Sequence, residues 1–346
     1  MSESIMADLL SQHDSRNMGG YARSFIDDFE AAIQLETGLS PDSDWSGVIC
    51  LGMGGSGAGG RFLKSITDSE GGIPFVVWSD YGLPSWWGPE WLVLATSYSG
   101  NTEETLDGVR EALESGGSVV AVSSGGQLSD LVTGSDDATL MEIPSGQMPR
   151  SAFGHIFGTQ MAVCWDMGLL PRPNEGELSA MLKRLRKASS EADPISGDAM
   201  WEAMAKSLVD REIGIISSTE LGPAGYRFAC QINENANDFA TPSNVPEMNH
   251  NEIVAWCSEG QSRAMIVLTC EGIHPRSQTR LQWVMDNVEN QVSWRIECEG
   301  ESMLERLLYA AHVTDWVSIM LAVLKGQDPS EMAPIDSLKA FLSSVQ

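Results

Sequence analysis

The sequence lacks the features that mark several classes of protein. Its six cysteines form no CxxC pair and its five histidines form no HxxxH or His/Cys pair. Neither a disulfide framework nor a metal site is therefore predicted. No apolar run reaches the roughly 18 residues that cross a bilayer, and the polar start MSESIMADLL does not resemble a signal peptide. These absences favour a cytoplasmic protein with reduced thiols and no membrane partner.

Positive charge is scarce as well. Six lysines and fifteen arginines face 48 acidic residues, which gives a formal charge of −27 at pH 7. A chain this acidic repels nucleic acid and anionic membranes, so neither is a predicted partner. Low lysine with excess carboxylate is also what a salt-rich cytosol favours, a hypothesis that the sequence leaves open.

Strand-like and helix-like segments alternate along the chain. The N-terminal part to about Thr37 is predicted to be helical, with an apolar stripe through Phe25, Phe29, Ile33 and Leu35. Strands are predicted at 47–52, 74–80, 91–97, 118–124, 139–144, 211–218, 263–270 and 292–298. This alternation predicts an α/β protein with parallel sheets covered by helices on both faces.

The length of the chain favours two domains over one. We predict a first domain at residues 1–168 and a linker at 169–176, rich in proline and polar residues. The second domain, 177–346, repeats the α/β plan and closes with helices at 303–325 and near 335–342.

A glycine-rich loop, GMGGSGAGG (Gly52 to Gly60), follows the first predicted strand and opens a helix. It contains GxGxxG, and Asp80 ends the next strand, as in a dinucleotide-binding fold. The glycines could equally let the backbone approach a phosphate or a sugar, or simply form a tight turn. A nicotinamide-dependent dehydrogenase is therefore one alternative.

A hydroxyl-rich turn, SYSGNTEET, follows the strand WLVLATS and begins a helix near Glu103. It gathers Ser97, Ser99 and Thr102 at a helix N-terminus, where free backbone N–H groups and the helix dipole favour an anion. A serine-rich turn before an ordinary helix is the plainer interpretation. A dinucleotide domain has no use for this second cluster, whereas a sugar-phosphate site does.

Together these two loops resemble the signature loops of a sugar-isomerase (SIS) domain. Three later motifs extend the resemblance: PRSA with Arg150, NENAN…PEMNHNEIVAW with Glu234 and His250, and PIDSLKAFL with Lys339. In this order they resemble the archaeal-type bifunctional phosphoglucose/phosphomannose isomerases, which have two SIS domains of the flavodoxin-like three-layer kind. Two departures stand out: Arg61 replaces an expected acidic residue, and the surroundings of Lys339 match only loosely.

The resemblance implies a function and a role for each site residue. It implies interconversion of glucose 6-phosphate, and of mannose 6-phosphate, with fructose 6-phosphate through a cis-enediol, without cofactor or metal. Glu234 would move the proton, Arg150 would stabilise the enediolate, and His250 with Lys339 would open the sugar ring. The phosphate would be held by neutral groups of the two loops: Gly55, Ser56, Ser97, Ser99 and Thr102.

The resemblance also implies a homodimer in which His250 reaches the active site of the other subunit. A rival from another class is a non-catalytic regulator that binds a sugar phosphate. Such a regulator would not require the pair of Glu234 and His250.

Overall fold

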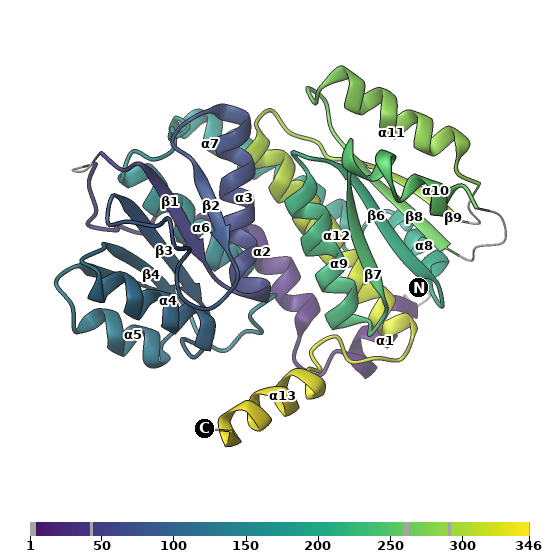
Figure 1. Ribbon diagram of the computed structural model, residues 1–346. Coiled ribbons are helices and arrows are strands. Elements are labelled where there is room, and N and C mark those ends of the chain that lie inside the picture. Colours follow the sequence, from purple (N-terminus) through teal and green to yellow (C-terminus); the bar gives the residue numbers. More distant parts are fainter. Residues whose placement is uncertain (1–4, 42–43, 259–262, 290–291, 346) are drawn as a thin grey trace.

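The computed structural model describes residues 5–41, 44–258, 263–289 and 292–345, and it contains two parallel sheets (Figure 1). The first has the order β2-β1-β3-β4-β5 and the second the order β7-β6-β8-β9. The first sheet comprises β1 (Gly47–Leu51), β2 (Phe75–Trp78), β3 (Trp91–Ser97), β4 (Val119–Ser123) and β5 (Ala138–Glu142). The second comprises β6 (Glu212–Ser218), β7 (Ala240–Val245), β8 (Arg263–Thr269) and β9 (Val292–Glu297).

Helices cover both sheets and fill the space between them (Figure 1). In the first half they are α1 (Ile5–His13), α2 (Met18–Ile33), α3 (Gly54–Glu70), α4 (Glu103–Glu114), α5 (Gly126–Thr133) and α6 (Phe153–Asp166). The second half has α7 (Glu175–Ala192), α8 (Ala199–Leu208), α9 (Gly222–Asn235), η1 (Glu247–His250), α10 (Ile253–Trp256), α11 (Pro275–Asn287), α12 (Met303–Leu324) and α13 (Ala333–Ser344). The predicted α/β fold with parallel sheets is confirmed.

The sequence missed some elements and misjudged others. It did not predict α5, and it did not predict β7, whose proline suits only the edge of a sheet. The N-terminal helical part is two helices, because the Asp14 carboxylate accepts hydrogen bonds from the amides that begin α2. The apolar stripe ends early: Leu35 lies beyond α2 and is 38% exposed, so its place in the stripe was wrong.

The division into two domains at 169–176 stays a prediction. Helix α7 already begins at Glu175, where Asn174 and Glu177 form a capping box. Helix α2 from the first part packs against α7 and α12 from the second. A polar linker is also predicted at residues 40–46, SPDSDWS, and its residues 42 and 43 lie outside the described residues.

Helix α12 lies between the two sheets (Figure 1). By length and composition it could cross a membrane, which corrects the expectation that no segment would qualify. However, 89% of its most apolar window is buried against the rest of the chain. It packs on α2, α3, α7, α8 and α9. Its apolar character is therefore explained by its place in the core.

A cluster of phenylalanines ties α3 to α6. Phe153 and Phe157 stack with ring centroids 5.4 Å apart, and the Phe62 ring meets both edge-on at 5.0 and 5.4 Å. Edge-to-face contacts of this kind add to the stabilisation from burial. The cluster fixes the start of α6 against α3, the helix that follows the glycine-rich loop.

We expect Phe157→Ala to lower the free energy of unfolding by about 3–5 kcal/mol, because it leaves a cavity in this cluster. Phe239→Ala is the matched control, since the Phe239 side chain is 75% exposed. Urea unfolding followed by tryptophan fluorescence measures both. Equal losses in the two variants would contradict the role given to the cluster.

Candidate active site

Arg150 lies just before α6, and its side chain links this segment to the end of α9 and to the segment around Pro329. Its side chain is only 3% exposed. Nε donates to the Asn235 side-chain oxygen at 2.6 Å, Nη1 to Glu234 Oε2 at 3.2 Å, and Nη2 to the Pro329 carbonyl at 2.5 Å. Burial lowers the pKa of Arg150, and the neighbouring Glu234 carboxylate opposes that shift. The guanidinium is thus a fixed positive charge.

Glu234 is the acidic group that faces this charge. It lies in the last turn of α9, and its side chain is 24% exposed. Burial raises the pKa of Glu234, whereas Arg150 and Arg227 act to lower it. A largely desolvated carboxylate with a raised pKa, held beside a cation, has the properties of a general base.

Arg227 supports the pair from two turns earlier on α9. Its guanidinium lies over the Phe153 ring, 4.5 Å from the centroid. It donates to both Asp315 oxygens at 2.5 and 3.0 Å and to the Arg150 carbonyl at 3.1 Å. Gln231 donates to the same Asp315 carboxylate at 2.5 Å. Asp315, in the middle of α12, therefore anchors α9.

Helix α12 also positions Asn235, the residue next to Glu234. Asn235, which accepts from Arg150, donates to Ser318 Oγ at 2.9 Å. Sequence reasoning missed Arg227 and Asp315. The signal was there, because a carboxylate inside the longest apolar helix needs a buried partner.

The glycine-rich loop approaches the Arg150–Glu234 pair. A Cβ atom on Gly55 would lie 3.1 Å from the backbone nitrogen of Arg150, so the close contact needs a glycine or a shift of the backbone. A small pocket forms where the loop and α9 meet. It is lined by Gly54, Gly55, Ala58, Arg150, Tyr226, Arg227, Cys230, Gln231 and Glu234.

The hydroxyl-rich turn lies next to the glycine-rich loop, because β1 and β3 are neighbours in the sheet. Ser56 Oγ accepts from the Tyr98 amide at 3.1 Å, which links the two loops. Ser97 Oγ and Thr102 Oγ1 are 2.8 Å apart, and Ser99 is exposed. The loops stand at the carboxyl ends of β1 and β3, where the strand order reverses and where ligands bind in such sheets.

His250 and Lys339 lie elsewhere in the single chain. His250 ends η1 and is exposed, and it does not line the Glu234 pocket. Lys339 is in α13, a helix with no buried residue that projects from the body of the protein (Figure 1). The structure thus brings together Gly55, Arg150 and Glu234, and the roles of His250 and Lys339 stay predictions.

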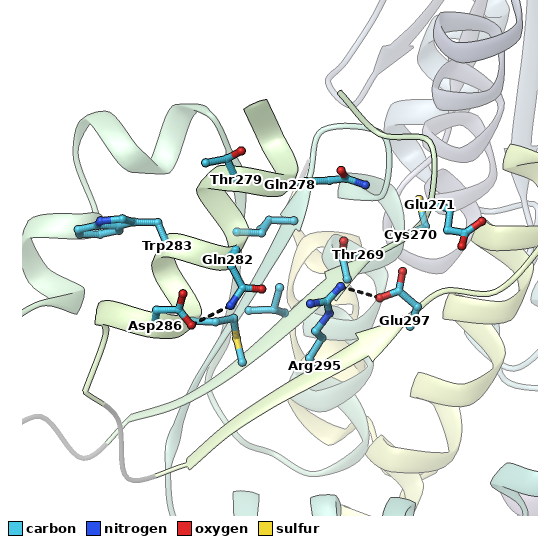
Figure 2. A pocket seen from close by; sticks show the side chains of 13 residues that line it. Thr269, Cys270, Glu271, Gln278, Thr279, Gln282, Trp283, Asp286, Arg295 and Glu297 are labelled. Carbon is cyan, nitrogen blue, oxygen red and sulfur yellow. Dashed lines mark hydrogen bonds and ion pairs between the residues drawn. The ribbon is translucent and has the colours of Figure 1, made fainter. Parts of the chain in front are cut away.

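A separate pocket lies between α11 and the strands β8 and β9 (Figure 2). Four of its polar side chains form pairs: Arg295 with Glu297 at 2.9 Å and Gln282 with Asp286 at 2.7 Å. None of the predicted site residues lines it. Within the described ranges, no group of three His, Cys, Asp or Glu side chains could hold a metal ion.

Comparison with known proteins defines the class. The fold resembles the crystal structure of a hypothetical protein from Thermus thermophilus, with a TM-score of 0.75 at 14% identity over 98% of this chain and 93% of that one. Residues 199–342 match the bacterial phospho-glucose isomerase C-terminal SIS domain. This match assigns the second half of the chain to the class of sugar-isomerase (SIS) domains.

Curated relatives narrow this class to one family. The bifunctional phosphoglucose/phosphomannose isomerase of Caldicellulosiruptor bescii is 31% identical over 86% of this chain and 90% of that protein. The enzyme of the same name from Thermoplasma acidophilum is 30% identical over the same shares. The chain belongs to the family of bifunctional phosphoglucose/phosphomannose isomerases, which confirms the predicted resemblance.

We expect Asp315→Asn to lower the free energy of unfolding by about 3–5 kcal/mol, because it leaves the buried Arg227 charge without its partner. Glu297→Gln removes one partner of the exposed Arg295–Glu297 pair and should cost less than about 1 kcal/mol. Urea unfolding at neutral pH compares the two. A loss in Asp315→Asn no larger than in the control would mean that the Arg227 pair does not hold α9 to α12.

Proposed function

We propose that this protein interconverts glucose 6-phosphate and mannose 6-phosphate with fructose 6-phosphate. The observation that carries the proposal is the Glu234 carboxylate, desolvated and paired with Arg150 in a pocket that the glycine-rich loop also lines. Membership of the isomerase family supports the same reaction class. A regulator would need no such base, and a dehydrogenase would need no second hydroxyl-rich loop.

The reaction moves one proton between adjacent carbons. In our proposal Glu234 takes the proton from C2 of the aldose, which leaves a cis-enediolate that becomes the cis-enediol once O1 is protonated. Glu234 then returns its proton to C1 while O2 loses its own, which gives the ketose. Negative charge develops on oxygen while the carbon is deprotonated. A guanidinium has five N–H donors, of which Arg150 uses three within the protein. The remaining two can stabilise the enediolate oxygen.

The phosphate would be held by neutral donors of the two loops. Gly55 and Ser56 lie at the start of α3, and Ser97, Ser99 and Thr102 lie before α4. Backbone N–H groups at two adjacent helix starts supply partial positive charge for the phosphate oxygens. Anchored there, the sugar would extend toward Glu234, because Gly55 also lines the Glu234 pocket.

Ring opening would use His250 of a second subunit together with Lys339. The exposed apolar side chains support a dimer: α13 exposes Ile335, Leu338, Phe341 and Leu342, and Val254 is exposed in α10, which follows η1. Exposed apolar groups gathered in this way mark surfaces that a partner covers. We propose a homodimer in which each active site draws on both chains.

We expect Glu234→Gln to bind fructose 6-phosphate with near-normal affinity and to lose a factor of about 10²–10⁴ in kcat, because the amide cannot accept the proton. Calorimetry measures the binding, and a coupled assay with each hexose 6-phosphate measures kcat. In the parent protein kcat/KM should fall as the pH drops through the raised pKa of Glu234, at a higher pH than an ordinary glutamate would give.

Glu220→Gln is the matched control for this measurement. Glu220 lies just before the first residue of α9, whereas Glu234 lies in its last turn, and Glu220 does not line the Glu234 pocket. It should keep the kcat of the parent protein. Near-normal turnover in Glu234→Gln would remove Glu234 as the base.

Mixing two inactive variants tests the shared site. If His250 crosses the interface, a heterodimer of Glu234→Gln and His250→Ala has one site with both changes and one intact site. Equal mixing with subunit exchange should then restore about a quarter of the parent activity. Activity that stays at the level of the separate variants would show that His250 does not act across subunits.

A further inference from the structure

A second, larger pocket lies toward the other end of α3 and α9 from the proposed active site, and Tyr226 lines both pockets. Its volume is about 1000 Å³, which is enough for a small phosphorylated ligand. It is formed by the end of α3, the start of α9, the loops after β6 and β8, and the start of α12. None of the predicted site residues lines it.

The two halves of the chain repeat one topology. The order β1-α3-β2-β3-α4-β4 in the first half corresponds to β6-α9-β7-β8-α11-β9 in the second, where η1 and α10 are inserted between β7 and β8. The strand orders β2-β1-β3-β4 and β7-β6-β8-β9 match as well. In this correspondence β6 and β8 are the counterparts of β1 and β3, whose carboxyl ends carry the proposed phosphate loops.

The second pocket lies at the carboxyl ends of these counterparts. Thr219 and Gly222 follow β6, and Gly272 and Ile273 follow β8, and all four line the pocket. This is the position in the second sheet where the strand order reverses and where α/β sheets bind ligands.

The contacts between helices follow the same correspondence. The Glu234 pocket combines the start of α3 with the end of α9, and the second pocket combines the start of α9 with the end of α3. Ser65 Oγ donates to the Glu220 carbonyl at 2.6 Å, which joins those two ends. The amide of Met303, at the start of α12, donates to Glu70 at 3.3 Å, as Arg150 before α6 donates to Glu234.

The second pocket contains two arginines whose positive charge an anion would neutralise. The Arg61 guanidinium lies over the Tyr226 ring, 4.3 Å from the centroid, and Arg306 Nε donates to the Gly300 carbonyl at 3.1 Å. Among the described residues neither forms an ion pair, although the chain is strongly acidic. A Cβ atom on Gly272 would lie 3.5 Å from Arg306 Nη1, so this guanidinium lies beside the loop after β8.

Four acidic side chains line the pocket, and among the described residues two of them, Asp68 and Glu301, form ion pairs. Lys64 pairs with Asp68 at 2.5 Å, and Glu301 pairs with Arg184 at 3.2 Å. Glu220 Oε2 is buried, and no group of the described residues donates a hydrogen bond to it. A buried acceptor of this kind calls for a donor, and a sugar or polyol hydroxyl supplies one.

We propose that this second pocket binds a phosphate monoester of a polyol or sugar, with Arg306 and Arg61 facing the phosphate and Glu220 accepting from a hydroxyl group. The choice of ligand class rests on the proposed function, because the repeat relates this pocket to the sugar-phosphate site. The site is separate from the Glu234 pocket, so one chain would hold two such ligands.

Calorimetry with glucitol 6-phosphate, which has no carbonyl and cannot isomerise, tests the proposal. The parent protein should bind two molecules per chain. Arg306→Met should weaken one of them at least ~10-fold, because a guanidinium–phosphate contact is lost, and should leave kcat unchanged. The double variant Ser97→Ala/Ser99→Ala should weaken the other. Arg295→Met, which removes an arginine from the pocket in Figure 2, should change neither.

Binding of one molecule per chain to the parent protein would overturn the proposal if the serine double variant weakens that binding and Arg306→Met does not. Two sites that both survive Arg306→Met would overturn it too. So would inorganic phosphate that binds the second site as tightly as glucitol 6-phosphate. If only the serine double variant fails to weaken a site, the phosphate loops of the proposed function are wrong and the second pocket stands.

Discussion

The buried contact between Arg150 and Glu234 is the interaction on which the proposed site depends. Taking a guanidinium out of water is costly, and the cost is offset only when its donors find acceptors. Here a carboxylate, an amide oxygen and a backbone carbonyl meet three of its donors. Glu234 remains partly accessible, so the pair is fixed on one side and open on the other. This arrangement gives the carboxylate a defined place without closing it to a substrate.

The helix α12 explains why that contact can form between distant parts of the chain. Arg150 comes from the first half, and Glu234 is supplied by α9 in the second. Asp315 accepts from Arg227, and Ser318 accepts from Asn235. Two residues one turn apart on α12 therefore fix the two side chains that flank the Arg150–Glu234 pair. The long apolar helix of the core thus carries the polar groups that position the proposed site.

The sequence predicted the parts of this site that depend on local chemistry. The glycine-rich and hydroxyl-rich loops follow from strand-to-helix turns, and Arg150 and Glu234 from motifs. It did not predict the Arg227–Asp315 pair, because only packing shows that α9 and α12 meet at those positions. Strand β7 was not predicted, because the segment ATPSNV lacks the apolar alternation of a strand. The places of His250 and Lys339 could not follow from one chain if a second chain completes the site.

The repeat of the two halves explains why one pocket would catalyse and the other would only bind. The end of α9 carries Glu234, desolvated and in contact with a buried guanidinium. The corresponding end of α3 carries Glu70, which is exposed and accepts a backbone amide instead. Without desolvation and a fixed cation, a carboxylate is a weak base and nothing stabilises an enediolate beside it. In our proposals the arginines of the second pocket therefore recognise an anion, while Glu234 alone transfers the proton.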